Sequence, residues 1–195
     1  KKWRCLMEWI NHFNIFLACT LFMLFAGVLC DMVLFQLIQA EKVPMTAAII
    51  MIVTAIFLEI YGTSFYTLRC ILICHVLLLA GAADIAKHEI PDAFHLLIAI
   101  IGLIDFQPMD ALYGLLIVPL PFLIVALKTG KIGGGDVKLM AASGFVLGVS
   151  KGFYMIILGL VMALLWNEVM RRGKESIPLA PFLALGCFMA LLPVS

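Results

Sequence analysis

The stretch Lys131-Ile132-Gly133-Gly134-Gly135-Asp136-Val137-Lys138 separates two strongly apolar runs of this chain. An aspartate at the centre of a membrane helix costs about 2.5–3.5 kcal/mol on insertion scales, so a retained carboxylate usually marks chemistry or a transport path. The glycines in front of it let the backbone bend and lie close to another chain. Asp136 therefore calls for a chemical role and for a partner group.

The composition predicts an integral membrane protein. Of the 195 residues, 65% are hydrophobic and 13% are charged, and the mean hydropathy is +1.16. A spanning helix needs about 20 apolar residues, so the chain has room for about six to eight spans and for no sizeable soluble domain. We predict an all-α fold, a polytopic transmembrane helix bundle of about eight helices. It forms a single membrane domain over residues 1–195, and residues 1–11 lie at the membrane surface ahead of the first helix.

Charge and cysteine usage argue against two classes of site. The net charge is +1, and the Lys and Arg residues lie between apolar runs, so we expect no nucleic-acid partner. The six cysteines include no C-x-x-C pair and mostly lie inside apolar runs, where cysteine behaves as a small hydrophobic residue. We therefore expect neither a metal site nor a disulfide framework.

The order of the apolar runs predicts that Asp84 lies near Asp136. The predicted helices cover residues 12–39, 45–61, 68–83, 93–104, 111–127, 136–149, 152–170 and 177–192. Asp84 ends the third of them and Asp136 begins the sixth, and the chain between makes one complete hairpin that turns at Asp105 to Asp110. Both aspartates are therefore predicted at the same membrane face.

The distribution of Lys and Arg between the two faces predicts which face is cytoplasmic, because short cytoplasmic loops carry an excess of these residues. On the predicted aspartate face lie Lys42, Lys87, Lys128, Lys131, Lys138, Arg171, Arg172 and Lys174. On the opposite face lie Lys1, Lys2, Arg4, Arg69 and Lys151. We therefore predict that the aspartates face the cytoplasm.

Two neighbouring carboxyl groups can carry out acid and base catalysis together. They tend to share one proton, which leaves one group as base and the other as acid at the same pH. In peptide hydrolysis the ionised group would take a proton from water, and the protonated group would hydrogen-bond the scissile carbonyl. This chemistry requires neither a metal nor a covalent nucleophile. The three glycines before Asp136 would let an extended peptide approach the start of its helix, or they simply form a tight loop.

Several features in a fixed order resemble one known family. Asp84 is followed by Ile90-Pro91-Asp92, and the G-x-G-D at Gly133 to Asp136 is followed by Lys138. These residues resemble the type IV prepilin peptidases, which are membrane aspartyl proteases of the GxGD class. The stretches Phe57-Leu58-Glu59-Ile60 and Ile177 to Gly186 are similar to further motifs of this family, and the resemblance spans about residues 45–192.

The resemblance implies a function and a set of site residues. Asp84 and Asp136 would be catalytic, and active-site support or substrate binding would fall to Gly133, Gly134, Gly135, Pro91, Asp92 and Lys138. The substrates would be prepilins or pseudopilins of type IV pilus or type II secretion systems. Their short basic leader peptides would be cleaved at the cytoplasmic face of a prokaryotic inner membrane.

Many family members also methylate the new N-terminus with S-adenosylmethionine. This chain lacks the cysteine-rich insertion of the longer members, because only Gln39 to Pro44 link the first two helices. It also has Gly27-Val28-Leu29-Cys30-Asp31 where a G-S-F-L-N motif is expected. We expect peptide cleavage without a cofactor, and S-adenosylmethionine only if methyl transfer is retained.

The residues themselves suggest more modest roles for Asp92 and Lys138. Asp92 follows Pro91 at a predicted helix start, where an aspartate is a good cap. Lys138 lies roughly 200° around the helix from Asp136, so it is expected to point away and extend to the interface.

Two other functions remain as alternatives. A small proton-coupled transporter or channel would also carry intramembrane aspartates and glycine-broken helices, although the chain shows no internal repeat. A presenilin-like or signal-peptide-peptidase-like protease shares G-x-G-D, but Ala83 precedes Asp84 where such enzymes carry a tyrosine.

Overall fold

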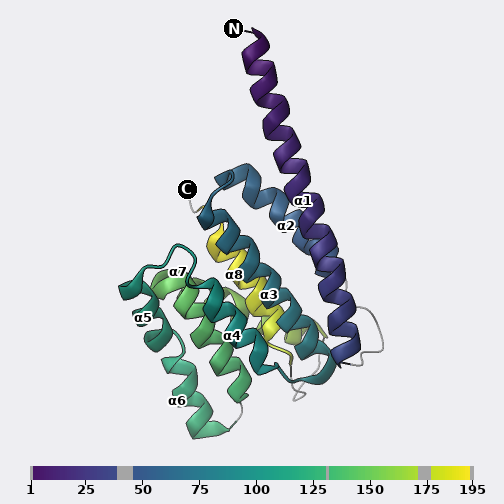
Figure 1. Ribbon diagram of the computed structural model, residues 1–195. Helices are drawn as coiled ribbons and strands as arrows, with labels where there is room; N and C mark the ends of the chain where they lie inside the picture. Colours follow the sequence, from purple (N-terminus) through teal and green to yellow (C-terminus); the bar gives the residue numbers. More distant parts are fainter. Residues whose placement is uncertain (1, 39–45, 131, 171–176, 194–195) are drawn as a thin grey trace.

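The computed structural model of the protein is a bundle of helices (Figure 1). It describes residues 2–38, 46–130, 132–170 and 177–193, without the side chains of residues 2–13, 34, 37, 38 and 129. Its helices are α1 (Lys2–Ile38), α2 (Thr46–Tyr61), α3 (Phe65–Lys87), α4 (Asp92–Ile101), α5 (Pro108–Ile117), α6 (Leu120–Thr129), α7 (Gly134–Met170) and α8 (Ala180–Leu191). No strand occurs in these ranges, so the predicted all-α helix bundle is confirmed.

Several helices are long and apolar enough to cross a membrane. The candidate spans in the described part of the chain are Asn14–Val33, Phe65–Lys87, Pro108–Lys128 and Gly134–Met170. With the shorter apolar helices α2, α4 and α8 packed among them, the chain is a multi-pass membrane protein.

The first helix starts earlier than predicted. Residues 1–11 were expected to precede it, but α1 is helical from Lys2. No glycine or proline occurs before Gly27, so nothing in this segment interrupts a helix. Residue 1 and the side chains of residues 2–13 lie outside the described part, and so does the predicted contact of this segment with the membrane surface.

The predicted helix over residues 111–127 consists of two helices, α5 and α6. They meet at Val118 and Pro119, and Pro121 follows in the first turn of α6. Proline has no backbone N–H and its ring clashes with the preceding turn, which breaks the helix there. The predicted hairpin remains, because Pro108–Lys128 still forms one candidate span.

The long helix α7 reverses direction at Gly148. This residue has φ 73° and ψ −175°, a conformation that other residues rarely adopt. A Cβ atom built on Gly152 would lie 3.6 Å from Cα of Gly144, whereas eight residues of a continuous helix span about 12 Å. The predicted helices 136–149 and 152–170 are therefore present as two legs of α7, and the break falls slightly earlier than expected.

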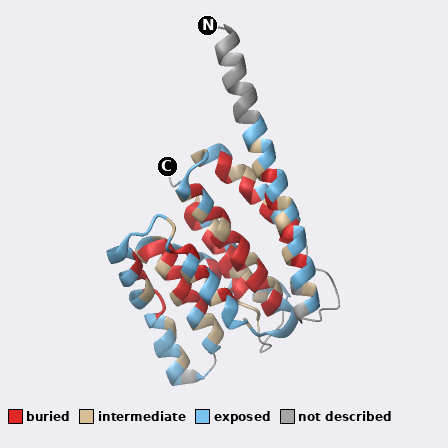
Figure 2. Cartoon of the chain, in the orientation of Figure 1, coloured by how far each residue is buried: buried red, intermediate tan, exposed pale blue. Residues whose placement is uncertain are grey.

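The core lies where α3, α7 and α8 meet. Figure 2 shows buried residues concentrated on these helices and exposed residues on α1 and α6. Fully buried side chains include Phe57, Ile73, Leu77, Met140, Met155 and Leu183. Because lipid tails are as apolar as leucine, membrane helices associate largely through close packing at small residues. A Cβ on Gly114 would lie 2.0 Å from the Gly144 carbonyl oxygen, so glycine is needed where α5 contacts α7.

The two ends of the bundle carry different segments. The end of α3 and the starts of α4, α7 and α8 lie together at the lower end in Figure 1, and the α4–α5 link lies at the other end. Lys87 and Lys138 belong to the first group of segments, and Lys128 lies in the last turn of α6, whereas Arg69 and Lys151 lie in neither of these places. The other basic residues used to predict orientation lie outside the described residues or have undescribed side chains: Lys1, Lys2, Arg4, Lys42, Lys131, Arg171, Arg172 and Lys174.

Candidate active site

Asp84 lies in the last turn of α3 and is held by the start of another helix. Its side chain is 6% exposed, and Oδ2 accepts a hydrogen bond from the Ala180 backbone N–H at 2.9 Å. Ala180 is the first residue of α8, so its N–H is one of those that have no partner within the helix. The positive end of the α8 dipole therefore points at the Asp84 carboxylate.

A glycine one turn before Asp84 makes this contact possible. A Cβ atom on Gly81 would lie 2.9 Å from Cα of Pro181, closer than such atoms approach one another. Any larger residue would push the start of α8 away from α3. Neither Gly81 nor a structural role for the Ile177 to Gly186 segment was predicted from the sequence. That segment supplies the amide that binds Asp84.

Asp136 lies in the first turn of α7 and is half-buried. Its backbone N–H donates to the Gly133 carbonyl at 3.1 Å, and a Cβ on Gly133 would lie 3.2 Å from its Oδ2. The side chain therefore folds back over Gly133. An electrostatic interaction links its carboxyl group to that of Asp84. The structure thus brings the two aspartates to the same end of the bundle, as the order of the helices predicts.

The glycine run before Asp136 packs against the start of α4 and leaves one face open. A Cβ on Gly135 would lie 3.7 Å from Cβ of Ile90, the residue before Pro91. Apart from its chain neighbours and the nearby backbone of its own helix, no described atom lies within 4 Å of the position where a Cβ on Gly134 would be. The run is therefore anchored on one side and accessible at Gly134.

Asp92 and Lys138 form an ion pair between the starts of α4 and α7. Lys138 Nζ donates to Asp92 Oδ1 at 2.9 Å, and the side chains are 61% and 78% exposed, respectively. The hydrogen bond and the positive charge of Lys138 lower the pKa of Asp92. The predicted cap was wrong, because Pro91 occupies the N-cap position and Asp92 is already the first helical residue. Lys138 reaches Asp92, a contact that the sequence analysis did not predict.

His95 is a site residue that the sequence analysis missed. Its Nε2 lies 3.1 Å from the Gly135 carbonyl oxygen, which can only accept, so the hydrogen is on Nε2. Its Nδ1 lies 3.4 Å from Asp92 Oδ1, and the ring is 11% exposed. His95 thereby connects the glycine run to α4. The three-residue spacing from Asp92 could have identified it, because residues three apart share one face of a helix.

A metal centre has no support in the part of the chain that the structure describes. No group of three or more His, Cys, Asp or Glu side chains there is arranged to hold an ion. The described parts of the acidic site are two carboxyl groups, a helix N-terminus and a glycine run.

Comparison with known proteins agrees with this arrangement. Residues 70–167 match the Type IV leader peptidase family, a match that includes both Asp84 and Asp136. The chain is 32% identical over 148 residues to the prepilin leader peptidase/N-methyltransferase of Bacillus subtilis (strain 168). That match covers 68% of this chain and 58% of the relative, so the chain corresponds to little more than half of that protein. No solved structure matches the chain significantly.

The family match covers about half of the chain and includes α4, α5, α6 and most of α3 and α7, the elements that carry both aspartates and the glycine run. With the aspartates at one end of a membrane helix bundle, this chain belongs to the type IV leader peptidase family.

Proposed function

We propose that the protein is a membrane aspartyl endopeptidase that cleaves the leader peptides of type IV prepilins or pseudopilins. The observation that carries the proposal is the pairing of two aspartates from distant parts of the chain at one end of the bundle. Asp84 is fixed by the Ala180 amide, and the charge of Asp136 interacts with it. The family match and the relative named as a prepilin leader peptidase support the choice of substrate.

The proposed reaction divides acid and base work between the two carboxyl groups. We assign the base to Asp84, because the Ala180 N–H and the start of α8 stabilise a negative charge there. Asp84 takes a proton from water while the protonated Asp136 hydrogen-bonds the scissile carbonyl oxygen. The water oxygen bonds to the carbonyl carbon, the C–N bond breaks, and the leaving nitrogen receives the proton that Asp84 took from water. The peptide bond is hydrolysed without a metal or a covalent intermediate.

The glycine run is proposed to receive the substrate backbone. Gly134 offers open space beside Asp136, so an extended peptide can approach without meeting a side chain. His95 and the Asp92–Lys138 pair hold the run against α4, and Pro91 fixes the start of that helix. These residues position the cleavage site and do not take part in proton transfer.

The proposed location is the inner membrane of a prokaryote, with the active site at the cytoplasmic face. An excess of Lys and Arg in the sequence at the aspartate end supports this location. Peptide cleavage is proposed to need no cofactor. S-adenosylmethionine would be needed only if the chain also methylates the new N-terminus, as the name of its relative suggests.

The test is to incubate the purified full chain, reconstituted in liposomes, with a candidate prepilin and to measure product masses. A mass loss equal to the leader peptide supports the proposed peptidase, and an additional methyl group in the presence of S-adenosylmethionine supports methyl transfer. Intact substrate after incubation, with a known prepilin peptidase cleaving the same sample, would overturn the proposal.

A further inference from the structure

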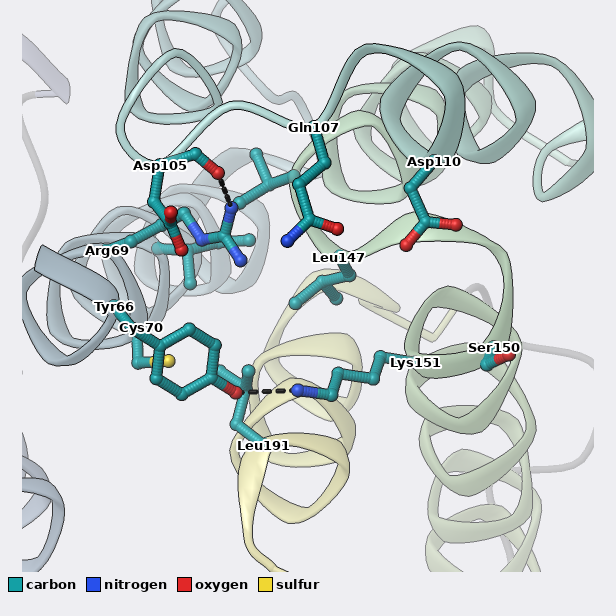
Figure 3. Close-up of a pocket in the computed structure, with 12 residues that line it drawn as sticks. Tyr66, Arg69, Cys70, Asp105, Gln107, Asp110, Leu147, Ser150, Lys151 and Leu191 are labelled. Carbon is teal, nitrogen blue, oxygen red and sulfur yellow. Dashed lines mark hydrogen bonds between the residues drawn. The ribbon is translucent and has the colours of Figure 1, made fainter. Parts of the chain in front are cut away.

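A polar cavity lies at the end of the bundle opposite the aspartates. Its volume is about 230 Å³, below the roughly 300–1,000 Å³ that drug-sized ligands occupy. Its polar and charged lining comes from the start of α3, the α4–α5 link, the start of α5 and the reversal of α7: Tyr66, Arg69, Asp105, Gln107, Asp110 and Lys151. Figure 3 shows these side chains arranged around one space. None of them has a role in the proposed peptide cleavage.

Two cations in this cavity are held in place by other parts of the chain. Arg69 Nη1 donates to the carbonyl oxygens of Ile104 and Asp105 at 3.3 and 2.9 Å. Lys151 Nζ donates to the Tyr66 hydroxyl at 2.6 Å and lies 4.9 Å from the centre of its ring. A guanidinium has five N–H donors and an ammonium three, so both side chains keep donors for a ligand.

Two carboxylates balance these cations. Asp105 and Asp110 line the same cavity, so the formal charges of the four side chains cancel. Among the described residues, the Asp110 carboxylate makes no hydrogen bond or ion pair. A Cβ on Gly148 would lie 2.9 Å from Asp110 Oδ2, so the glycine at the α7 reversal makes room for this carboxylate. The negative charge of Asp110 would repel a simple anion in this cavity. A ligand that carries both a negative and a positive group could pair its positive group with Asp110.

We propose that this cavity binds a phosphate–ammonium zwitterion, supplied by the head group of an ethanolamine phospholipid. Arg69 and Lys151 bind the phosphate oxygens through charge-assisted hydrogen bonds, and Asp110 accepts from the primary ammonium. The volume accommodates a head group and excludes the acyl chains, which then lie along the outer apolar surface of the bundle.

The position of the cavity favours a membrane lipid over a soluble zwitterion. The lining residues stand where α3 starts and where α4 is linked to α5, at one end of two candidate spans. Large apolar side chains next to them in the sequence are exposed, among them Phe106 at 45% and Met109 at 70%. A lipid could keep its acyl chains on such a surface while its head group enters the cavity.

Native mass spectrometry of the purified full chain tests the proposal. Ethanolamine, choline and glycerol phospholipids with identical acyl chains are titrated separately, and free phosphoethanolamine is titrated in parallel. The ethanolamine lipid should bind at one site about tenfold more tightly than the other two, because the choline group cannot donate to Asp110 and the glycerol lipid lacks a cation. Tighter binding of the lipid than of free phosphoethanolamine identifies the membrane as the source, and equal binding identifies a soluble zwitterion in the same site.

Variants separate the site from general lipid adhesion. Lys151→Gln and Asp110→Asn should each weaken binding of the ethanolamine lipid about tenfold, a loss typical of one charge-assisted hydrogen bond. Lys128→Gln and Glu168→Gln make the same chemical changes at exposed positions outside the cavity and should leave binding unchanged. Equal binding of the three lipids, or equal losses in cavity and control variants with unchanged thermal unfolding, would overturn the proposal.

Discussion

Oδ2 of Asp84 lies 2.9 Å from the backbone nitrogen of Ala180, so the last turn of α3 and the first turn of α8 meet at a single carboxylate. One half of the proposed catalytic pair is therefore oriented by a helix that begins almost a hundred residues later in the chain, at a separation of 96 residues. The other half, Asp136, is oriented by its own glycine run. The arrangement leads to four predictions.

The first prediction concerns the two carboxyl groups. Asp84→Asn and Asp136→Asn should each reduce leader cleavage by about 10²–10⁴-fold, the range for loss of a general acid or base. Initial rates with a prepilin peptide measure the effect. Asp105→Asn makes the same change at the other end of the bundle, where Asp105 has φ 53°, a conformation that asparagine also adopts. Its rate should equal that of the unaltered protein, and wild-type rates in either of the first two variants would refute the proposed pair.

The second prediction concerns the close approach of α3 and α8. Gly81→Ala should force Pro181 away, because its Cβ would lie 2.9 Å from the Pro181 Cα. Overpacking of this kind costs about 1–3 kcal/mol, and the Asp84–Ala180 hydrogen bond should lengthen, so both thermal stability and cleavage should fall. Ala86→Ser adds one atom at an exposed position of the same helix and serves as the control. An unchanged unfolding temperature in Gly81→Ala would contradict the packing described for α8.

The third prediction treats His95 as a positioning residue. His95→Ala removes the donor to the Gly135 carbonyl, a hydrogen bond worth about 0.5–1.5 kcal/mol. We expect kcat to fall by roughly two- to tenfold, and because the ring is 11% exposed, the thermal unfolding temperature should fall as well. Gln has an amide N–H that can replace Nε2–H, so His95→Gln should recover part of the loss. Equal loss in both variants would show that the hydrogen bond to the glycine run is unimportant.

The fourth prediction concerns the pH dependence of the Asp92–Lys138 pair. Lys138 lowers the pKa of Asp92 in the folded protein below its ordinary value of 3.8. The unfolded chain therefore binds this proton at a higher pH than the folded chain does. The pair's contribution to stability is present above about pH 4 and is lost as the pH falls through the lowered pKa.

Thermal unfolding of Lys138→Met measures this contribution. It should unfold at a slightly lower temperature than the unaltered protein at neutral pH, and the difference should disappear in acid. The expected difference is small because both side chains are largely exposed. The exchange of both residues, Asp92→Lys with Lys138→Asp, should restore the neutral-pH value. A difference that persists in acid would assign the effect to the lysine side chain alone.

Much of the fold followed from local patterns in the sequence. Long apolar runs separated by polar, glycine or proline residues predicted the helices, because each spanning helix satisfies its own backbone hydrogen bonds. The number of crossings between Asp84 and Asp136 then placed both at one end of the bundle. Pro119 and Pro121, which divide α5 from α6, were also visible in the sequence but were not interpreted as a helix break.

Only the tertiary structure decided which distant groups meet. Four contacts depend on how the helices pack. Ala180 binds Asp84, Gly81 faces Pro181, and His95 binds Gly135. At the opposite end, charged residues enclose a cavity. Hydropathy and spacing define each helix separately, whereas these contacts depend on the rotation and depth of one helix against another. The sequence by itself therefore determined the membrane helices and the shared location of the two aspartates, and the packing of α3, α4, α7 and α8 determined the geometry of the site.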